Sequence, residues 1–354
     1  MSRYLSALRR RMIPYVPGEQ PQDQRYVKLN TNESPFPPAP GVVEAAAAEA
    51  GRLQLYSDPL CRAVRQRLAA LHHVDVENVL VTNGSDEALN FLFLAYGDAD
   101  RPFVFPDLTY GLYPVLCDLY DLPRAVVPLK EDFSVDVQAM ARAGGPIVLA
   151  NPNAPTGMAL PVGVIRDLAE QNPDRLVIVD EAYVDFGAES CVPLIHELEN
   201  LLVVQTFSKS RSLAGGRLGM IFGPAALMRE VEAVRCSLNP YNVNRMTLAA
   251  GAAALDQEAY TRANCLTIME TRAWTAEQLT RLGFRVLPSQ ANFLFAAPPG
   301  LTGSAYYEKL KEKGVLVRHF KGKREAPFVR VTVGSREQME ILLQKTCEIL
   351  EETP

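Results

Sequence analysis

The chain lacks the features that mark several classes of protein. Its six cysteines are scattered without a Cys-x-x-Cys pair and its four histidines form no cluster, so the sequence predicts neither a disulfide framework nor a metal site. A net charge of −5 and a pI near 5.6 give no indication of a basic surface for binding nucleic acid or an anionic membrane. No apolar run approaches a membrane span, and no secretory signal is recognisable. We therefore expect a cytoplasmic protein without metal, nucleic-acid or membrane partners.

The remaining sequence has the pattern of an α/β protein. Short apolar runs alternate with stretches of helical period, and the runs are apolar on both faces. Such runs, separated by helices, are typical of a mostly parallel sheet that helices cover on both sides. The expected strands lie at residues 79–81, 103–105, 125–127, 147–149, 176–179, 201–204 and 220–222.

The 354 residues are enough for two domains. Residues 1–40 are rich in proline and predict an extended arm. Residues 41–240 form the predicted large domain. An alanine-rich helical pattern at 241–282 predicts a linking helix, and 283–354, together with part of the arm, predict a small α+β domain.

Chemically active side chains follow two of the expected strands. Lys209 closes the motif Thr-Phe-Ser-Lys after the run at 201–204, and Arg217 follows eight residues later. Asp180 and Tyr183 follow the run at 176–179. A lone lysine is usually a solvated surface residue, and an aspartate after a strand usually caps a turn or helix.

The joint occurrence of these motifs makes that ordinary explanation improbable. A third strand end carries the motif Asn-Pro-Asn-Ala-Pro-Thr-Gly at 151–157. Ligand groups in open α/β sheets gather beyond the carboxyl ends of the strands. We therefore expect the three motifs to meet at one edge of the sheet.

The combined side chains suit pyridoxal phosphate, a cofactor with an aldehyde, a pyridine nitrogen, a phenol and a phosphate. Lys209 can bond covalently to the aldehyde, and the carboxylate of Asp180 can keep the ring nitrogen protonated, so that the ring accepts electrons. Neighbouring hydroxyls and the guanidinium of Arg217 can bind the phosphate.

Each of three further motifs has two possible interpretations. Residues 83–87 (Asn-Gly-Ser-Asp-Glu) suit either an ordinary helix cap at Ser85 or a phosphate site at a helix start. Tyr110, after another strand, suits stacking on a pyridine ring or packing against the sheet. Arg330 interrupts an apolar strand, so it must face solvent or meet an anion.

The whole chain resembles the histidinol-phosphate aminotransferases of the fold-type I group of pyridoxal-phosphate enzymes. The lysine and Asp-x-x-Tyr motifs are highly specific for the fold group, and the arm and the strand around Arg330 point to the subfamily. The residues that carry the resemblance lie at 14–21, 29–33, 83–87, 151–157, 180–183, 206–209 with Arg217, and 330–334.

The resemblance implies a role for each residue around the cofactor. Lys209 would bind it covalently, Asp180 would pair with the ring nitrogen, and Tyr183 would hydrogen-bond the phenolic oxygen. Tyr110 would stack on the ring. The phosphate would be held by Ser85, Asp86, Thr206, Ser208 and Arg217.

The resemblance also implies a homodimer with shared active sites. Tyr56 would reach the phosphate from the partner subunit, and Arg330 would bind the substrate anion. The rest of the substrate pocket would be lined by Tyr15, Asn32, Asn292 and Arg318. One position departs from the family, because many relatives place asparagine where this chain has Ala154; Asn153, one residue earlier, is the candidate substitute.

The implied reaction is transamination between L-histidinol phosphate and 2-oxoglutarate, which in the biosynthetic direction converts imidazole-acetol phosphate with glutamate. Two relatives of the same fold stay open as alternatives. One is an aromatic amino-acid aminotransferase, and the other is a decarboxylase of a phosphorylated amino acid. A cofactor-sensing regulator and a non-catalytic remnant are less consistent with an intact Lys209.

Overall fold

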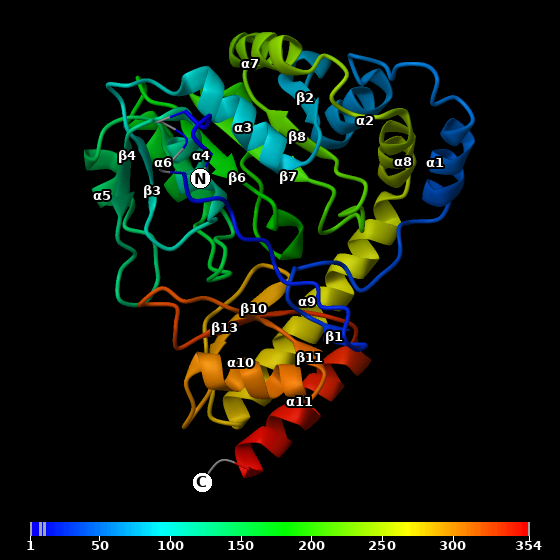
Figure 1. The fold of residues 1–354 in the computed structure, drawn as a ribbon. Helices are drawn as coiled ribbons and strands as arrows, with labels where there is room; N and C mark the ends of the chain where they lie inside the picture. The colour runs from blue at the N-terminus through cyan, green and yellow to red at the C-terminus, as the bar shows by residue number, and fades with distance from the viewer. Residues whose placement is uncertain (1, 7–8, 10–11, 353–354) are drawn as a thin grey trace.

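The computed structural model describes residues 2–6, 9 and 12–352. Its larger sheet has seven strands in the order β2-β8-β7-β6-β5-β3-β4 (Figure 1). All neighbours pair in parallel except β8, which is antiparallel to both β2 and β7. The predicted mostly parallel α/β sheet is therefore confirmed. The strands are β2 (Val79–Thr82), β3 (Phe103–Pro106), β4 (Arg124–Val127), β5 (Ile147–Ala150), β6 (Val177–Asp180), β7 (Leu201–Thr206) and β8 (Gly219–Phe222).

Helices cover both faces of this sheet because its strands are apolar on both sides. In β6, Val177 and Val179 pack into one hydrophobic cluster with residues of α2, α6 and α8, whereas Ile178 faces a second cluster with α3, α4 and α7. Every residue of β6 is buried. The covering helices are α2 (Arg62–His72), α3 (Ser85–Tyr96), α4 (Leu112–Tyr120), α5 (Val137–Arg142), α6 (Val162–Glu170), α7 (Ala225–Leu238) and α8 (Arg245–Leu255).

The smaller sheet is antiparallel, with the order β12-β13-β10-β9. The N-terminal segment joins this part of the molecule, because β1 (Val27–Lys28) pairs in parallel with β11 (Val315–Leu316). The other elements here are β9 (Arg285–Val286), β10 (Phe293–Ala297), β12 (Arg318–His319), β13 (Val329–Thr332), α10 (Gly303–Glu312) and α11 (Arg336–Glu351).

The expected linking helix is divided in two. The helix is interrupted at Asp256 and Gln257, between the end of α8 and the start of α9 (Glu258–Arg281). The carboxylate of Asp256 forms a two-pronged ion pair with Arg67 of α2, which ties the end of α8 to the large sheet's helices. Only α9 runs on to the smaller sheet (Figure 1). We propose a division into arm, large domain and small domain in which α9 alone is the link.

The carboxyl ends of the central strands meet at one edge of the large sheet. Asp180 is level with Ala150 of β5 and Val204 of β7. Gly219 lies opposite both Thr82 and Thr206. A Cβ on Gly219 would come within 2.5 Å of the backbone of Gly84, so glycine is required for the start of α3 to lie beside this edge.

Candidate active site

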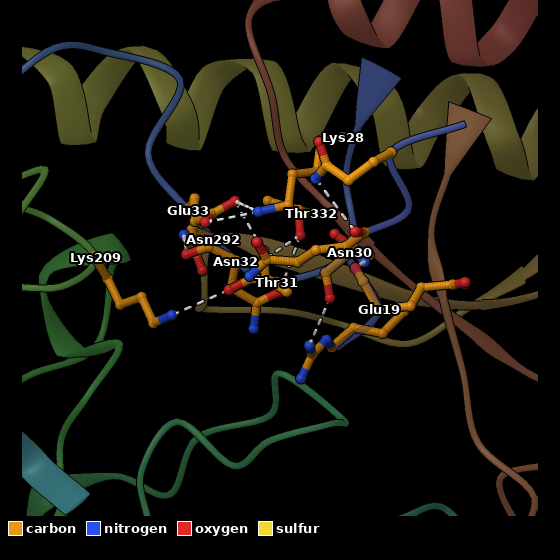
Figure 2. A network of polar contacts seen from close by, with 12 residues as sticks. Glu19, Lys28, Asn30, Thr31, Asn32, Glu33, Lys209, Asn292 and Thr332 are labelled. Carbon is orange, nitrogen blue, oxygen red and sulfur yellow. Dashed lines mark hydrogen bonds and ion pairs between the residues drawn. The ribbon is translucent and has the colours of Figure 1, made fainter. Parts of the chain in front are cut away.

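Lys209 follows β7 and faces the N-terminal segment. Its amine Nζ donates to the carbonyl of Thr31 at 3.1 Å and stands 5.9 Å from the centre of the Tyr183 ring (Figure 2). Burial, with the nearby charge of Arg330, lowers the pKa of the amine to about 8, although the Glu33 carboxylate acts in the opposite direction. An amine that titrates near neutral pH can serve as a nucleophile and as a proton carrier.

Asp180 ends β6, the strand beside β7, and is almost completely buried. Its Oδ2 accepts from the hydroxyl of Tyr113 at 2.9 Å, and its Oδ1 accepts from the backbone N–H of Ala182 at 3.2 Å. Burial raises the pKa of the carboxyl group to about 6, although these two hydrogen bonds favour the charged form. A carboxylate with so little water around it strongly favours a cationic neighbour.

Tyr183 belongs to a hydrogen-bonded cluster that joins the N-terminal segment to residues beside the large sheet and in the smaller sheet. The side-chain amide of Asn32 donates to the Tyr183 hydroxyl at 2.9 Å. Asn292 donates to the carbonyl of Asn32, and the hydroxyl of Thr332 contacts both the backbone and the side chain of Asn32 (Figure 2). Asn32 has a φ of 56°, a left-handed conformation that asparagine tolerates better than most residues. The cluster thereby fixes the position of the tyrosine hydroxyl.

A set of hydroxyls and N–H groups lies where Thr82 and Thr206 end their strands. The hydroxyls of Thr206 and Ser208 contact each other at 3.0 Å. Ser85 is the first residue of α3, and the leading N–H groups of a helix have no carbonyl partner within it. The guanidinium of Arg217 lies against Gly84, where an added Cβ would approach within 2.6 Å. These groups together form a site suited to a phosphate.

Asp86 connects this phosphate site to Tyr110. One carboxylate oxygen accepts from Arg217 at 3.0 Å, and the other accepts from the Tyr110 hydroxyl at 2.8 Å. The Tyr110 ring is partly buried and meets the Tyr15 ring edge-on at 5.9 Å between centroids. The arm therefore passes over the site and brings Tyr15 to it, while Tyr15 itself stays 43% exposed.

Asn153 is close to the site but is fully engaged by the protein. Its amide nitrogen donates to the carbonyl of Leu108 and to the hydroxyl of Thr156, and its oxygen accepts from Thr109. Both amide N–H groups are therefore in use within the chain. The geometry suits a residue that holds the loop before Tyr110 better than one that donates to a ligand.

Arg330 is partly buried, which favours contact with an anion over full exposure to solvent. One terminal nitrogen donates to the carbonyl of Asn30 at 3.1 Å, while the buried Nε has no hydrogen-bond partner among the described residues. Burial lowers the pKa of the guanidinium. Phe293 and Phe320 lie 5.3 and 5.6 Å from its central carbon. A largely desolvated cation with an unused donor, and with no carboxylate partner in the described part of the chain, suits an incoming anion.

Arg318 is paired in register with Arg330 on the neighbouring strand. Its guanidinium donates to the carbonyls of Val16 and Pro17, at 3.0 and 3.1 Å. It therefore holds the arm over the site, in addition to supplying a second positive charge near Arg330.

Within the described part of the chain, Tyr56 makes no hydrogen bond, ion pair or ring contact with the other predicted site residues. Its side chain is 77% exposed, and its ring stacks on Tyr241 at 4.4 Å between centroids.

Two contributors were missed by sequence reasoning. Tyr113 stands one helical turn after Tyr110, so the i, i+3 spacing was a usable signal. Thr332 contacts Asn32 across 300 positions of sequence, and no local pattern reveals such a contact. Within residues 2–6, 9 and 12–352, no helix is long and apolar enough to cross a membrane, and no three His, Cys, Asp or Glu side chains are grouped to hold a metal ion.

The observed donors fit pyridoxal phosphate. An amine whose pKa is lowered by burial and a buried carboxylate come from the ends of two adjacent parallel strands, and a helix start with hydroxyls and an arginine lies at the same sheet edge. Lys209 would hold the aldehyde, Asp180 the ring nitrogen, and Tyr183 the phenolic oxygen. The phosphate would be held by Ser85, Thr206, Ser208 and Arg217.

Known proteins resemble the chain along nearly its full length. The family model for aminotransferase class I and II matches residues 24–345. A histidinol-phosphate aminotransferase of Syntrophus aciditrophicus is 48% identical over 98% of this chain and 96% of the relative. Histidinol-phosphate aminotransferase 1 of Bradyrhizobium diazoefficiens is 47% identical over 99% and 100%.

Solved structures share the fold. A histidinol-phosphate aminotransferase from Sinorhizobium meliloti, in complex with pyridoxal-5'-phosphate, has a TM-score of 0.90 and 23% identity, covering 100% of this chain and 99% of that one. An aspartate aminotransferase from Thermus thermophilus has a TM-score of 0.79 and 24% identity, covering 92% of each chain. The chain belongs to the class I and II aminotransferases and, within them, to the family of histidinol-phosphate aminotransferases.

Proposed function

We propose that this protein is a pyridoxal-phosphate-dependent aminotransferase that exchanges an amino group between L-histidinol phosphate and 2-oxoglutarate, as in histidine biosynthesis. The observation that carries the proposal is that Lys209 follows β7 and buried Asp180 ends the adjacent parallel strand β6, in a chain 48% identical to a histidinol-phosphate aminotransferase.

The bound cofactor supplies an aldehyde that receives the amino group and a ring that accepts electrons. Lys209 moves the proton to and from the substrate's α-carbon, which its pKa of about 8 allows near neutral pH. Asp180 keeps the ring nitrogen cationic, since a buried carboxylate is stabilised by a positive partner. Tyr183, fixed by Asn32, holds the phenolic oxygen.

One substrate presents a carboxylate and the other a phosphate, so the site must accept two different anions in turn. Arg330 suits both, because a guanidinium can pair bidentately with either group and its Nε has no partner among the residues that the structure describes. Arg318 and Tyr15 assist with the larger, phosphate-bearing substrate, because both lie where the arm crosses the site.

A substrate panel tests the proposal. Histidinol phosphate, phenylalanine and tyrosine are compared as amino donors to 2-oxoglutarate, with Lys209→Ala as the inactive control. We expect the highest kcat/KM with histidinol phosphate. A higher value with phenylalanine would replace the proposal with an aromatic aminotransferase. Release of carbon dioxide from a phosphorylated amino acid, without transfer to 2-oxoglutarate, would indicate the decarboxylase.

We also propose that the protein acts in the cytoplasm as a homodimer whose subunits share active sites. The stacked pair of Tyr56 and Tyr241 is exposed, and so are large apolar side chains close to them in sequence: Leu53, Leu55, Leu60 and Leu238. Exposed apolar groups of this kind favour an interface.

Hybrid dimers test the shared site. Lys209→Ala and Tyr56→Phe subunits, each impaired alone, are mixed after mild unfolding and refolding. We expect partial recovery of activity, because one site of each hybrid would have both residues intact. A monomer by light scattering at the assay concentration would contradict the shared site.

A further inference from the structure

Tyr113 is a completely buried tyrosine whose hydroxyl donates to the carboxylate of Asp180. It lies in the first turn of α4, and Tyr110 lies just before this helix, three residues earlier. The two rings meet edge-on at 5.7 Å between centroids, with planes 89° apart. The packing of Tyr113 is therefore coupled to that of the ring that faces the cofactor site.

The position of the Tyr113 hydroxyl is tightly determined. Its ring contacts Phe93 and Phe105, at 6.3 and 5.9 Å between centroids, and both are fully or nearly fully buried. The ring cannot turn away without opening the core, so the hydroxyl stays 2.9 Å from Oδ2 of Asp180.

Asp180 has few other sources of support. Within the described part of the chain, Tyr113 is the only side chain that donates a hydrogen bond to it; the other donor is the Ala182 backbone. The side chains of Asp86 and Asp180 also repel each other electrostatically. A buried carboxylate in such surroundings needs a donor to remain charged.

We propose that Tyr113 is a positioning residue of the reaction, whose hydroxyl holds Asp180 ionised and oriented toward the ring nitrogen of the cofactor. The proposal rests on the proposed function, in which Asp180 pairs with that nitrogen. Tyr113 touches neither substrate nor cofactor in this role and acts through Asp180 alone.

The consequences follow from loss of a single donor. In Tyr113→Phe the ring and its packing remain, but Asp180 loses its only side-chain donor and its pKa rises further. The carboxylate is the active form, and it is lost as pH falls through that pKa. The acidic limb of the profile of kcat against pH should therefore move to higher pH in the variant.

The experiment compares the Tyr113→Phe holoenzyme with the wild type and with Tyr120→Phe. Tyr120 is a matched control on the same helix, where its hydroxyl donates to Asn90 instead of a site residue. We expect kcat to fall roughly 10-fold to 150-fold, as for the loss of a hydrogen bond to a charged group, with KM for glutamate nearly unchanged. The control should keep the wild-type kcat and pH profile.

A second readout does not depend on turnover. The dissociation constant of pyridoxal phosphate from the apoprotein is measured by fluorescence quenching at pH 6 and pH 8. We expect Tyr113→Phe to weaken binding more at pH 6, where Asp180 is neutralised first. This arm remains informative if no amino donor is turned over, so failure of the proposed function is distinguishable from failure of this proposal.

Two results would overturn the proposal. One is an unshifted acidic limb together with the same pH dependence of cofactor binding as the wild type. The other is a fall in kcat that Tyr120→Phe reproduces. If Tyr113→Phe is unstable, Tyr113→His restores a ring donor, and activity that fails to recover above that of Tyr113→Leu would equally contradict the role.

Discussion

Replacing Arg330 with lysine tests how one site accepts two anions. The substitution keeps the positive charge but removes the planar pair of donors, including the buried Nε that has no partner. A lysine also lacks the second terminal nitrogen that reaches the carbonyl of Asn30. The ammonium is more strongly hydrated than a guanidinium, so burial beside Phe293 and Phe320 disfavours it further.

The magnitude follows from the hydrogen bonds that are lost. A hydrogen bond to a charged group contributes about 1.5–3 kcal/mol, and a loss of that size lowers kcat/KM about 10-fold to 150-fold. Since the guanidinium pairs with the carboxylate of glutamate and with the phosphate of histidinol phosphate, both half-reactions should weaken. The phosphate-bearing substrate retains Arg318 nearby, so the fall in kcat/KM for that substrate should lie at the lower end of this range.

Single-turnover kinetics with each amino donor measure the two half-reactions separately. Arg281→Lys is the control, because Arg281 forms an exposed pair with Glu277 at the end of α9, away from the site. It should behave as the wild type. A loss confined to glutamate would refute the dual role of Arg330 and assign the phosphate to other residues.

Two further substitutions test the carboxyl groups of Asp180, the last residue of β6, and of Glu181, which follows it. Asp180→Asn should still bind the cofactor but slow half-transamination about 100-fold or more, as for other preorganised electrostatic groups; near-normal turnover would remove Asp180 from the mechanism. Glu181 accepts hydrogen bonds from Ser190, Cys191 and Gln205, and burial raises its pKa to about 7 from 4.5. Because the folded state holds this proton more tightly, wild-type apoprotein should lose stability as pH rises from about 4.5 to 7, by up to about 1.4 kcal/mol per pH unit from this group. In urea unfolding at pH 5 and pH 8, the free energy of unfolding of Glu181→Gln should rise relative to that of the wild type at the higher pH. The same change with pH in both proteins would contradict this.

The sequence was most informative where local pattern and chemistry coincide. The expected strands of the large sheet all form, because runs apolar on both faces have few alternatives to a covered sheet. Lys209 and Asp180 were predicted to share one edge of the sheet because they follow parallel strands, and those strands are adjacent in the structure. That reasoning needs only the order of the elements.

Contacts between distant segments could not be predicted in this way. Asn32 meets Thr332 only because the N-terminal segment pairs with the small domain, a consequence of tertiary packing. The amide of Asn153 turned out to hold the loop of Thr109, and side-chain orientation of this kind has no sequence period. The helix end at Asp256 is accompanied by an ion pair with Arg67, 189 positions away, which no local pattern reveals.

Reduction of the holoenzyme with borohydride tests the central claim most directly. The reagent fixes the covalent bond between pyridoxal phosphate and a lysine, and peptide mapping by mass then locates it. The account predicts a single modified lysine, Lys209, and no labelling of any lysine in Lys209→Ala. Modification of another lysine in the wild type, or none at all in a protein that binds the cofactor, would contradict it.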